Sequence, residues 1–362
     1  MFIILLKEIF TILKFLLVID ILRFYFKYVT RQSPLPGPFP LPYIGNALQI
    51  LYMNFKEGNY QFDLGEYARM QVEKYGHISE VYQGSTRVIY LSKAEYLEKV
   101  YVPNSNSNYF ARPDLNGVSE VNAVHGLFFN NDFKSWKRIR KFVSQSLMSP
   151  RFIREFTSTI QQLFEESEHD WKNNDEEVIF NISEWSKCFT TDMNMATLMG
   201  RQTLCLASLK LDESEWTNEM KDSRKVKKSV ELFLKSIAFF TSFPKFLRHH
   251  FPIFNYYQNY FMNSLNFLKD FIHARIMERR EQIDRLQENE MIGSSLLDIL
   301  LTTNTSRDMH DDDSDQPLTD LEIRDKIVDL SIAGSDSSSN LFILAFWMIH
   351  IHPEVKMILR SA

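Results

Sequence analysis

The chain contains 362 residues, which is enough for one large domain or two smaller ones. Only 11 residues are glycine and 12 are proline, so turns are scarce and long helices are favoured. Apolar side chains make up 44% and charged side chains 24% of the residues, a balance that excludes collagen-like and disordered chains. The net charge of −5 provides no field that would recruit nucleic acid. The two cysteines are too few for a disulfide framework and fit a reducing, cytosol-facing environment.

The first 30 residues are dominated by Phe, Ile, Leu and Val and are long enough, as a helix, to cross a hydrocarbon layer of about 30 Å. Four charged residues interrupt this segment: Lys7, Glu8, Lys14 and Asp20. Because charges are costly inside a bilayer, the helix either spans the membrane, lies at its surface or docks on the protein itself. We expect a membrane anchor over residues 1–30, and the basic residues after it place the rest of the chain in the cytosol.

A proline-rich segment follows, with five of the twelve prolines between Ser33 and Pro42. Such a segment is extended and stiff. We therefore expect residues 31–46 to form a hinge between the anchor and a globular domain over residues 47–362.

Regular elements are predicted after the hinge. A helical pattern over residues 64–75 ends at Gly76, and two strand-like segments, 78–82 and 87–91, flank a glycine-serine turn. These strands predict a small β unit. From about Ser135 onward nearly every segment has a helical pattern.

Phenylalanine is unusually abundant, with 30 residues. Apolar side chains recur at spacings of three, four and seven between Phe261 and Leu286, which is typical of an amphipathic helix packed on one side. Between Phe233 and Phe261, eleven residues are Phe or Tyr. This aromatic segment forms either core and loop packing or a lid at a ligand entrance or membrane surface, and the sequence leaves both alternatives open.

An acidic segment precedes the last long helical pattern. Positions 1, 3, 5, 8 and 12 of a calcium-loop pattern are filled by Asp311, Asp313, Asp315, Leu318 and Glu322. Position 6 needs glycine for its sharp turn but is Gln316, so a solvated linker is favoured over a calcium-regulated adaptor. Thr319 and Glu322 also form a capping box, which predicts a helix from about residue 319 to 350.

Within that helix lies a run of poor helix formers, Ala333-Gly334-Ser335-Asp336-Ser337-Ser338-Ser339. The small Ala333 and Gly334 would let a flat ligand or small molecule approach the backbone, and the hydroxyls can distort the helix locally. Asp336 with its neighbouring hydroxyls could move protons. Taken alone, the run is more typical of a close helix crossing with a solvent-facing Asp.

A second candidate site lies on an earlier helix, where Trp136 and Arg140 are four residues apart and so share a face. An indole N–H and a guanidinium group both donate hydrogen bonds, and together they suit one or two carboxylates. The alternative is a surface cation–π contact on a helix that also carries Lys134, Lys137, Arg138 and Lys141.

The order of these features resembles that of the cytochrome P450 family. The apolar N-terminus, proline-rich hinge, β unit, Phe110-Ala111-Arg112-Pro113 and Trp136/Arg140 helix precede the Phe-rich middle, the small-residue helix and His352-Pro353-Glu354. The resemblance covers the whole chain and is most specific between Leu318 and Val355. It implies a mainly α, cytochrome P450-like helical fold with a small N-terminal β unit.

The resemblance also implies a cofactor, heme, and assigns residues to it. Trp136 and Arg140 would hold the heme propionates. Ala333 and Gly334 would line the distal oxygen pocket.

Asp336 and Ser337 would occupy the acid–alcohol pair that delivers protons to dioxygen at the iron. Ser337 departs from the usual threonine and lacks the methyl group that fixes its rotamer, which weakens the coupling of oxygen activation to substrate oxidation. Family members carry, further downstream, a Glu-x-x-Arg helix and a loop whose cysteine ligates the iron, whereas this chain ends at Ala362. Cys188 and Cys205 lack the glycine and basic residue of that loop, so they are interpreted as buried helix thiols and no metal ligand is predicted.

The implied function is a heme-dependent monooxygenase that inserts one oxygen atom from O₂ into a lipophilic substrate. NADPH–cytochrome P450 reductase is the implied partner, with a docking face at Lys137, Arg138 and Lys141, and the implied location is the endoplasmic reticulum membrane facing the cytosol. This chain is expected to be C-terminally truncated, to lack the heme–cysteine region and to be inactive alone. The alternative is a non-catalytic membrane-anchored helical protein that uses the same fold for binding or regulation.

Overall fold

The computed structural model describes residues 2–49, 52, 64–101, 126–128, 130, 132–172, 181–287, 293, 295–302 and 318–361. The chain divides into two compact units. The N-terminal unit comprises Met1–Val118 with Ile237–Asn255, and the helical unit comprises Ser119–Ser236 with Tyr256–Ala362. The calcium-loop positions 311–316 and residues 110–113 lie outside the described residues.

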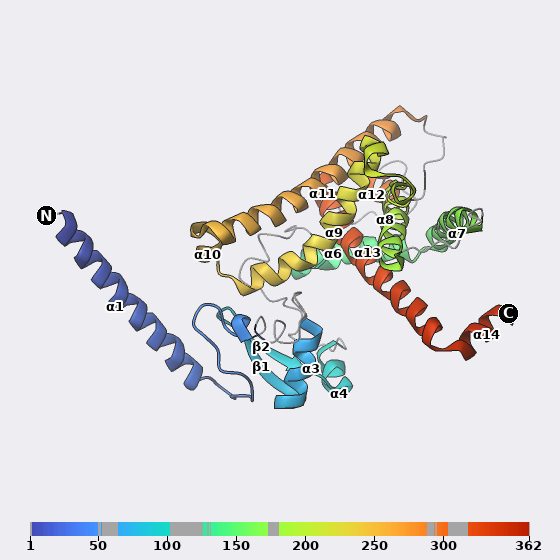
Figure 1. Ribbon diagram of the computed structural model, residues 1–362. Coiled ribbons are helices and arrows are strands. Elements are labelled where there is room, and N and C mark those ends of the chain that lie inside the picture. Colours follow the sequence, from blue (N-terminus) through green and yellow to red (C-terminus); the bar gives the residue numbers. More distant parts are fainter. Residues whose placement is uncertain are drawn as a thin grey trace. The chain divides into compact units, whose positions relative to one another are not determined.

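The described residues are mostly helical with one small antiparallel sheet, as predicted (Figure 1). The N-terminal unit contains α1 (Phe2–Val29), α3 (Leu64–Tyr75), β1 (Ile78–Gln83), β2 (Thr86–Leu91), α4 (Ala94–Tyr101) and α10 (Lys245–His250). The helical unit contains α6 (Phe133–Leu147), α7 (Pro150–Lys172), α8 (Ile182–Met199), the 3₁₀ turns η1 (Ala207–Lys210) and η2 (Glu213–Glu215), α12 (Leu296–Thr302), α13 (Asp320–Ile351) and α14 (Pro353–Ser361). Helices α9 (Asn218–Ser242) and α11 (Pro252–Arg285) contribute residues to both units.

The two predicted strands form the hairpin β1–β2, in which Val81 lies opposite Val88. Gly84 occupies the turn with a φ of +60°, a conformation that glycine adopts without steric cost. One face of the hairpin is covered by α3, whose Tyr67 is buried against Val81. Helix α3 ends at Gly76, as the sequence predicted, and that glycine also has a positive φ.

The proline-rich segment packs against β1. The Glu80 backbone N–H donates to the Pro36 carbonyl at 2.9 Å, and the buried Glu80 carboxylate accepts from Nε of Arg31 at 2.6 Å and Nε of Arg87 at 2.7 Å. Asn46 accepts a hydrogen bond from the backbone N–H of Tyr82 at 2.7 Å, which ties the end of the segment to the same strand. Extended proline-rich backbone has free carbonyls, so it can pair with β1 while it connects α1 to the sheet.

Helix α1 has 28 residues, and many of its apolar side chains are exposed, including Phe15 at 66% and Leu22 at 63%. Its C-terminal end is held by ring contacts of Phe24 and Tyr28 with Tyr82 of β1. Within the described part of the chain, no single helix has both the length and the apolar composition to cross a membrane. Helices α13 and α14 have the required length and apolar composition only when they are taken together, and the chain bends by 104° between them.

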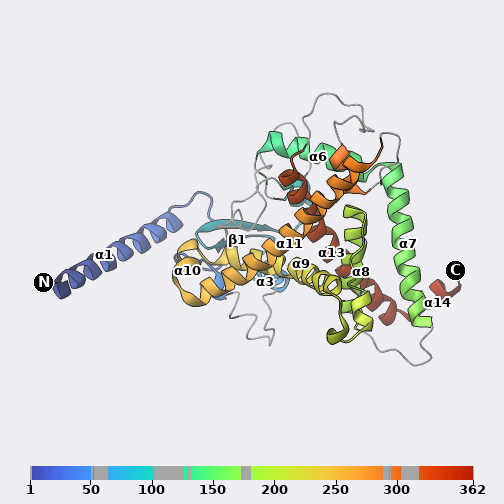
Figure 2. The same ribbon diagram turned by 90° about the horizontal axis from the view of Figure 1, so that it is seen from above.

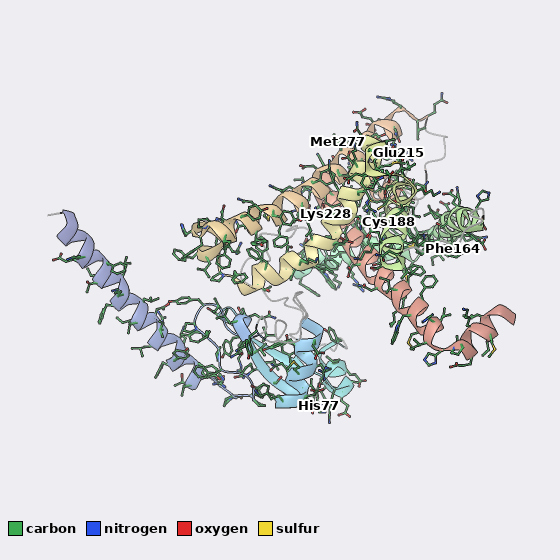
Figure 3. All side chains as sticks on the ribbon, in the orientation of Figure 1. His77, Phe164, Cys188, Glu215, Lys228 and Met277 are labelled. Carbon is green, nitrogen blue, oxygen red and sulfur yellow. The ribbon has the colours of Figure 1, made fainter. Side chains whose placement is uncertain are left out.

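The core of the helical unit lies around α8, which runs beside α13 in both views (Figures 1 and 2). Trp185, Phe189 and Met193 of α8 form a buried cluster with Leu163 of α7. Phe164 of α7 adds an edge-to-face contact with Phe189, with ring centroids 6.5 Å apart (Figure 3). Twelve of the 18 residues of α8 are buried, which makes it the central helix of this unit.

The predicted amphipathic stripe of α11 is confirmed, because its buried side chains include Leu265, Leu268, Ile272, Ile276 and Ile283. The aromatic segment between Phe233 and Phe261 contains both buried and exposed side chains. Phe233 and Phe240 are buried, whereas Phe246 is 64% and Tyr256 67% exposed. The segment therefore combines core packing with an exposed aromatic surface.

Candidate functional site

Helix α13 carries most of the predicted site. It begins at the predicted capping box, in which the Thr319 hydroxyl accepts from the Glu322 N–H and the Glu322 carboxylate accepts from the Thr319 N–H. It continues for 32 residues to Ile351, and Pro353 begins α14. The small-residue run lies inside this helix without a break in its α-helical backbone.

One face of the small-residue run packs against α8. A Cβ atom placed on Gly334 would lie 2.4 Å from Oδ1 of Asn194, so only a residue without a side chain fits there. Asn194 Nδ2 donates to Ser335 Oγ at 3.0 Å, and Thr190 Oγ1 donates to the Ser335 carbonyl at 3.0 Å. Gly334 therefore serves the close crossing of α13 and α8, and its backbone faces Asn194.

Ala333 and Ser337 lie on another face of α13, one helical turn apart. Ser337 is exposed, and its hydroxyl donates to the Ala333 carbonyl at 2.6 Å. This contact satisfies the hydroxyl within the helix and leaves its lone pairs toward the exposed face. A small side chain and a hydroxyl are thereby placed side by side on that face.

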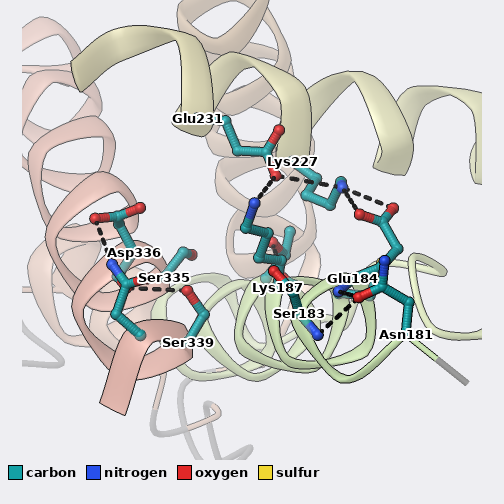
Figure 4. Close-up of polar contacts among 12 residues, drawn as sticks. Asn181, Ser183, Glu184, Lys187, Lys227, Glu231, Ser335, Asp336 and Ser339 are labelled. Carbon is teal, nitrogen blue, oxygen red and sulfur yellow. Dashed lines mark hydrogen bonds and ion pairs between the residues drawn. The ribbon is translucent and has the colours of Figure 1, made fainter. Parts of the chain in front are cut away.

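Asp336 is half-buried and lies beside a ladder of ion pairs between α8 and α9 (Figure 4). Its Oδ2 accepts from Nδ2 of Asn340 at 3.2 Å. Burial raises the pKa of Asp336; the charge of Lys187 lowers it and that of Glu231 raises it further. Lys187 and Glu231 form an ion pair of 3.3 Å, so Asp336 adjoins a balanced pair of charges and its protonated form is favoured more than in water.

The ladder continues away from Asp336 along α8 and α9. Lys227 lies 3.3 Å from Glu231 and 2.7 Å from Glu184, and Glu184 also accepts from Arg224 (Figure 4). Lys187 and Glu184 share one face of α8, and Lys227 and Glu231 are four residues apart on α9. The ladder is therefore a row of ion pairs from Lys187, whose charge acts on Asp336, to Arg224.

Trp136 and Arg140 lie on α6. Asp132 is the N-cap residue of this helix, and its side chain accepts hydrogen bonds from two N–H groups of the first turn. The Arg140 guanidinium lies 5.7 Å from the Trp136 ring centroid, which is the cation–π contact that the sequence left as the alternative to carboxylate binding. Trp136 is partly buried and Arg140 is exposed, so both donors are positioned on one face of the helix. Arg138 differs from the expectation of a basic docking face, because it forms an ion pair with Glu322 at the start of α13.

A buried acidic residue on α13 was missed by sequence reasoning. The Asp329 carboxylate is fully buried, and its Oδ2 accepts the backbone N–H groups of Leu127 at 2.6 Å and Phe128 at 3.1 Å. Burial raises the pKa of Asp329 to about 7, and these two N–H groups offset part of that effect. A charged residue among the buried apolar positions of α13 was the available signal, since such residues need a partner.

Both cysteines are fully buried, as predicted, but only Cys188 belongs to a helix. Cys205 lies in the turn that follows α8, and the two sulfur atoms are 2.9 Å apart. Among the residues that the structure describes, no group of three or more His, Cys, Asp or Glu side chains could hold a metal ion. The donor pair on α6 has the chemistry that binds carboxylates such as heme propionates, and the sulfur atoms of the two cysteines contact one another.

Comparisons with known proteins concern the family and the fold of the chain. The family model described as "Cytochrome P450" matches residues 35–361. Curated relatives include "Lithocholate 6-beta-hydroxylase" of Mesocricetus auratus, 25% identical over 90% of this chain and 59% of its own length, and "Cytochrome P450 3A9" of Rattus norvegicus, 23% identical over 92% of this chain and 60% of its own length. The chain thus spans about 60% of the length of these relatives.

A solved structure with the same fold is "Retinoic acid bound cyanobacterial CYP120A1". It superposes with a TM-score of 0.64 at 17% sequence identity, over 91% of this chain and 63% of that chain. At this level of identity the similarity concerns the fold alone.

Proposed function

Because the chain belongs to the cytochrome P450 family, we propose that it forms the distal side of a heme site in an enzyme that oxidises a lipophilic substrate with O₂. The observation that carries this proposal is the face of α13 on which Ala333 and the Ser337 hydroxyl lie one turn apart, next to the half-buried Asp336. Heme iron, when bound, supplies the activation of dioxygen. The residues of this chain bind, orient and supply protons.

The donors on α6 are suited to the heme propionates. The Arg140 guanidinium is exposed and always charged, and the neighbouring Trp136 indole N–H can donate beside it. On α13, Ala333 leaves space above a flat ring system because its side chain is a single methyl group. Asp336, whose pKa is raised by burial, can hold a proton that the Ser337 hydroxyl passes on toward the exposed face.

Heme titration of the purified chain tests this assignment. Arg140→Ala removes one charge-assisted hydrogen bond and is expected to weaken heme binding about tenfold, which absorbance in the Soret region and tryptophan quenching would measure. Lys137→Ala, an exposed cation on the same helix, is the matched control and is expected to leave the affinity unchanged. Equal losses in both variants would contradict a specific role for Arg140.

The identity of the iron ligand is tested separately. Cys188 and Cys205 contact one another inside the helical unit, so we expect the Cys188→Ser/Cys205→Ser double variant to keep the heme spectrum of the natural chain. A change in that spectrum would show that one of these thiols ligates iron.

The environment of the protein is also proposed from the family. Microsomal attachment at the endoplasmic reticulum, with NADPH–cytochrome P450 reductase as the electron donor, is consistent with the exposed apolar side chains of α1. Deleting residues 1–30 is expected to reduce sedimentation with liposomes, whereas Lys7→Ala would have little effect. Undiminished sedimentation of the deletion variant would exclude α1 as the anchor.

A second candidate is a non-catalytic binding or regulatory protein built on the same fold. The observation that favours it is that Gly334 of the small-residue run faces Asn194 of α8, so this part of the run serves helix packing. Such a protein would bind lipophilic ligands without consuming O₂ or NADPH in the presence of the reductase, which an oxygen electrode would measure.

A further inference from the structure

The two cysteines of the chain are 17 residues apart in sequence but adjacent in the structure. Their Sγ atoms are 2.9 Å apart, and both side chains are fully buried. A disulfide requires a separation of about 2.05 Å, so the two sulfur atoms must move closer by about 0.9 Å to form the bond. Cys188 and Cys205 are the two cysteines among the 362 residues.

The guanidinium group of Arg224 lies beside the two sulfur atoms. Arg224 of α9 donates from Nη1 to Cys188 Sγ at 3.1 Å, while its Nη2 pairs with Glu184 at 2.6 Å. Cys205 donates its thiol hydrogen to Cys188 Sγ. Cys188 Sγ therefore accepts two hydrogen bonds, one of them from a cation. The hydrogen bond to Cys188, followed by burial, raises the pKa of Cys205.

The turn that carries Cys205 is held against α8 by one buried carboxylate. Asp192 accepts from the Cys205 N–H at 3.0 Å, the Leu206 N–H at 2.8 Å and the Thr203 hydroxyl. Cys188 and Asp192 are four residues apart, so they share a face of α8. The carboxylate that holds the turn therefore also holds the Cys205 sulfur next to Cys188.

A cavity of about 620 Å³ lies in the helical unit, and neither cysteine lines it. Its lining includes the three residues Arg201, Gln202 and Thr203, and Thr203 is only two residues before Cys205. A small neutral oxidant can therefore approach the turn from the cavity, and a local opening of residues 203–206 would admit it to the sulfur atoms.

We propose that Cys188 and Cys205 form a reversible disulfide when a hydroperoxide oxidises them. The Cys188 thiol sulfur attacks one peroxide oxygen, the O–O bond breaks, and Cys188 becomes a sulfenic acid while its thiol proton leaves with the other oxygen as water. The Cys205 sulfur then attacks the Cys188 sulfur, and the S–O bond breaks as the S–S bond forms. The departing hydroxyl group takes up the Cys205 proton and leaves as the second water. In sum, two thiols and one hydrogen peroxide give one disulfide and two waters, and a dithiol reverses the reaction.

Intact-mass spectrometry of the full chain tests the proposal. After treatment with hydrogen peroxide, the native chain is expected to lose the mass of two hydrogen atoms, and dithiothreitol is expected to restore it. A sulfenic-acid probe is expected to label Cys205→Ser, in which Cys188 reacts first, and not Cys188→Ser. Arg224→Gln is expected to slow oxidation about tenfold, whereas Arg201→Gln, an arginine of the cavity rim that touches neither sulfur, is expected to match the natural chain.

Several results would overturn the proposal. Two free thiols that survive peroxide in the native chain yet react after unfolding would show that burial protects them. Labelling of Cys188→Ser in preference to Cys205→Ser would reverse the assigned roles, and a disulfide found only between molecules would exclude the internal bond. Far-UV circular dichroism of each variant establishes that it is folded before its oxidation rate is compared.

Discussion

Replacing Gly334 with alanine tests the close crossing of α13 and α8. The new Cβ would lie 2.4 Å from Oδ1 and 2.9 Å from Cγ and Nδ2 of Asn194, so the whole amide group must move. Asn194 is buried and its Nδ2 donates to Ser335 at 3.0 Å, so moving the amide breaks this hydrogen bond.

The size of the effect follows from three contributions. The lost hydrogen bond costs about 1 kcal/mol, and forcing the amide from its rotamer or parting the helices costs roughly 1–2 kcal/mol. Alanine is favoured over glycine within a helix by about 1 kcal/mol. We therefore expect Gly334→Ala to lower the free energy of unfolding by about 1–2 kcal/mol in the natural chain.

The effect of Gly334→Ala on the free energy of unfolding is expected to change sign when the Asn194 amide is absent. In an Asn194→Ala background, Gly334→Ala meets no amide and is expected to raise the free energy of unfolding by about 1 kcal/mol. Urea unfolding of the four proteins of this cycle, followed by circular dichroism, gives a coupling energy of about 2–3 kcal/mol. The same effect in both backgrounds, or a stabilising effect in the natural chain, would refute the reasoning.

Three further predictions concern stability. Burial raises the pKa of Asp329 from 3.8 to about 7, so the folded chain keeps a proton that the unfolded chain releases. This carboxyl therefore contributes a fall of about 4 kcal/mol in the free energy of unfolding as the pH rises from about 4 to 7. Asp329→Asn should remove that contribution and flatten the pH profile measured by urea unfolding, and an unchanged pH profile would contradict it. Thr319→Ala removes the capping box of α13 and should cost about 1 kcal/mol, which Thr319→Ser should restore in thermal unfolding. Gly45→Ala places a Cβ 2.1 Å from the Tyr82 carbonyl oxygen at a φ of +58°, and it should lower the free energy of unfolding by about 2 kcal/mol or more. Gly76→Ala is the control, because its Cβ meets no atom and only the positive φ is unfavourable. Equal losses of stability in the two variants would refute the steric argument.

The local elements could be predicted from the sequence. The capping box at Thr319 located the start of the last long helix, and Gly84 between two β-rich segments located the hairpin. The apolar stripe of α11 was visible because its period matches the turn of a helix. Trp136 and Arg140 were recognised as neighbours because four residues make about one helical turn. Each of these features depends on residues close together in the chain, so propensity and periodicity were sufficient.

Contacts between distant segments were decided only by the tertiary structure. Sequence could place Gly334 within a small-residue run, but only the packing of α13 on α8 shows that it faces Asn194 while Ser337 faces outward. Arg138 was expected on a free basic face, yet it pairs with Glu322, 184 residues away. Cys188 and Cys205 gave no signal of contact, since the path of the chain after α8 sets their distance. Residue type and spacing determine which helices form, whereas the crossing of those helices determines which side chains meet, and that crossing depends on the packing of the whole unit.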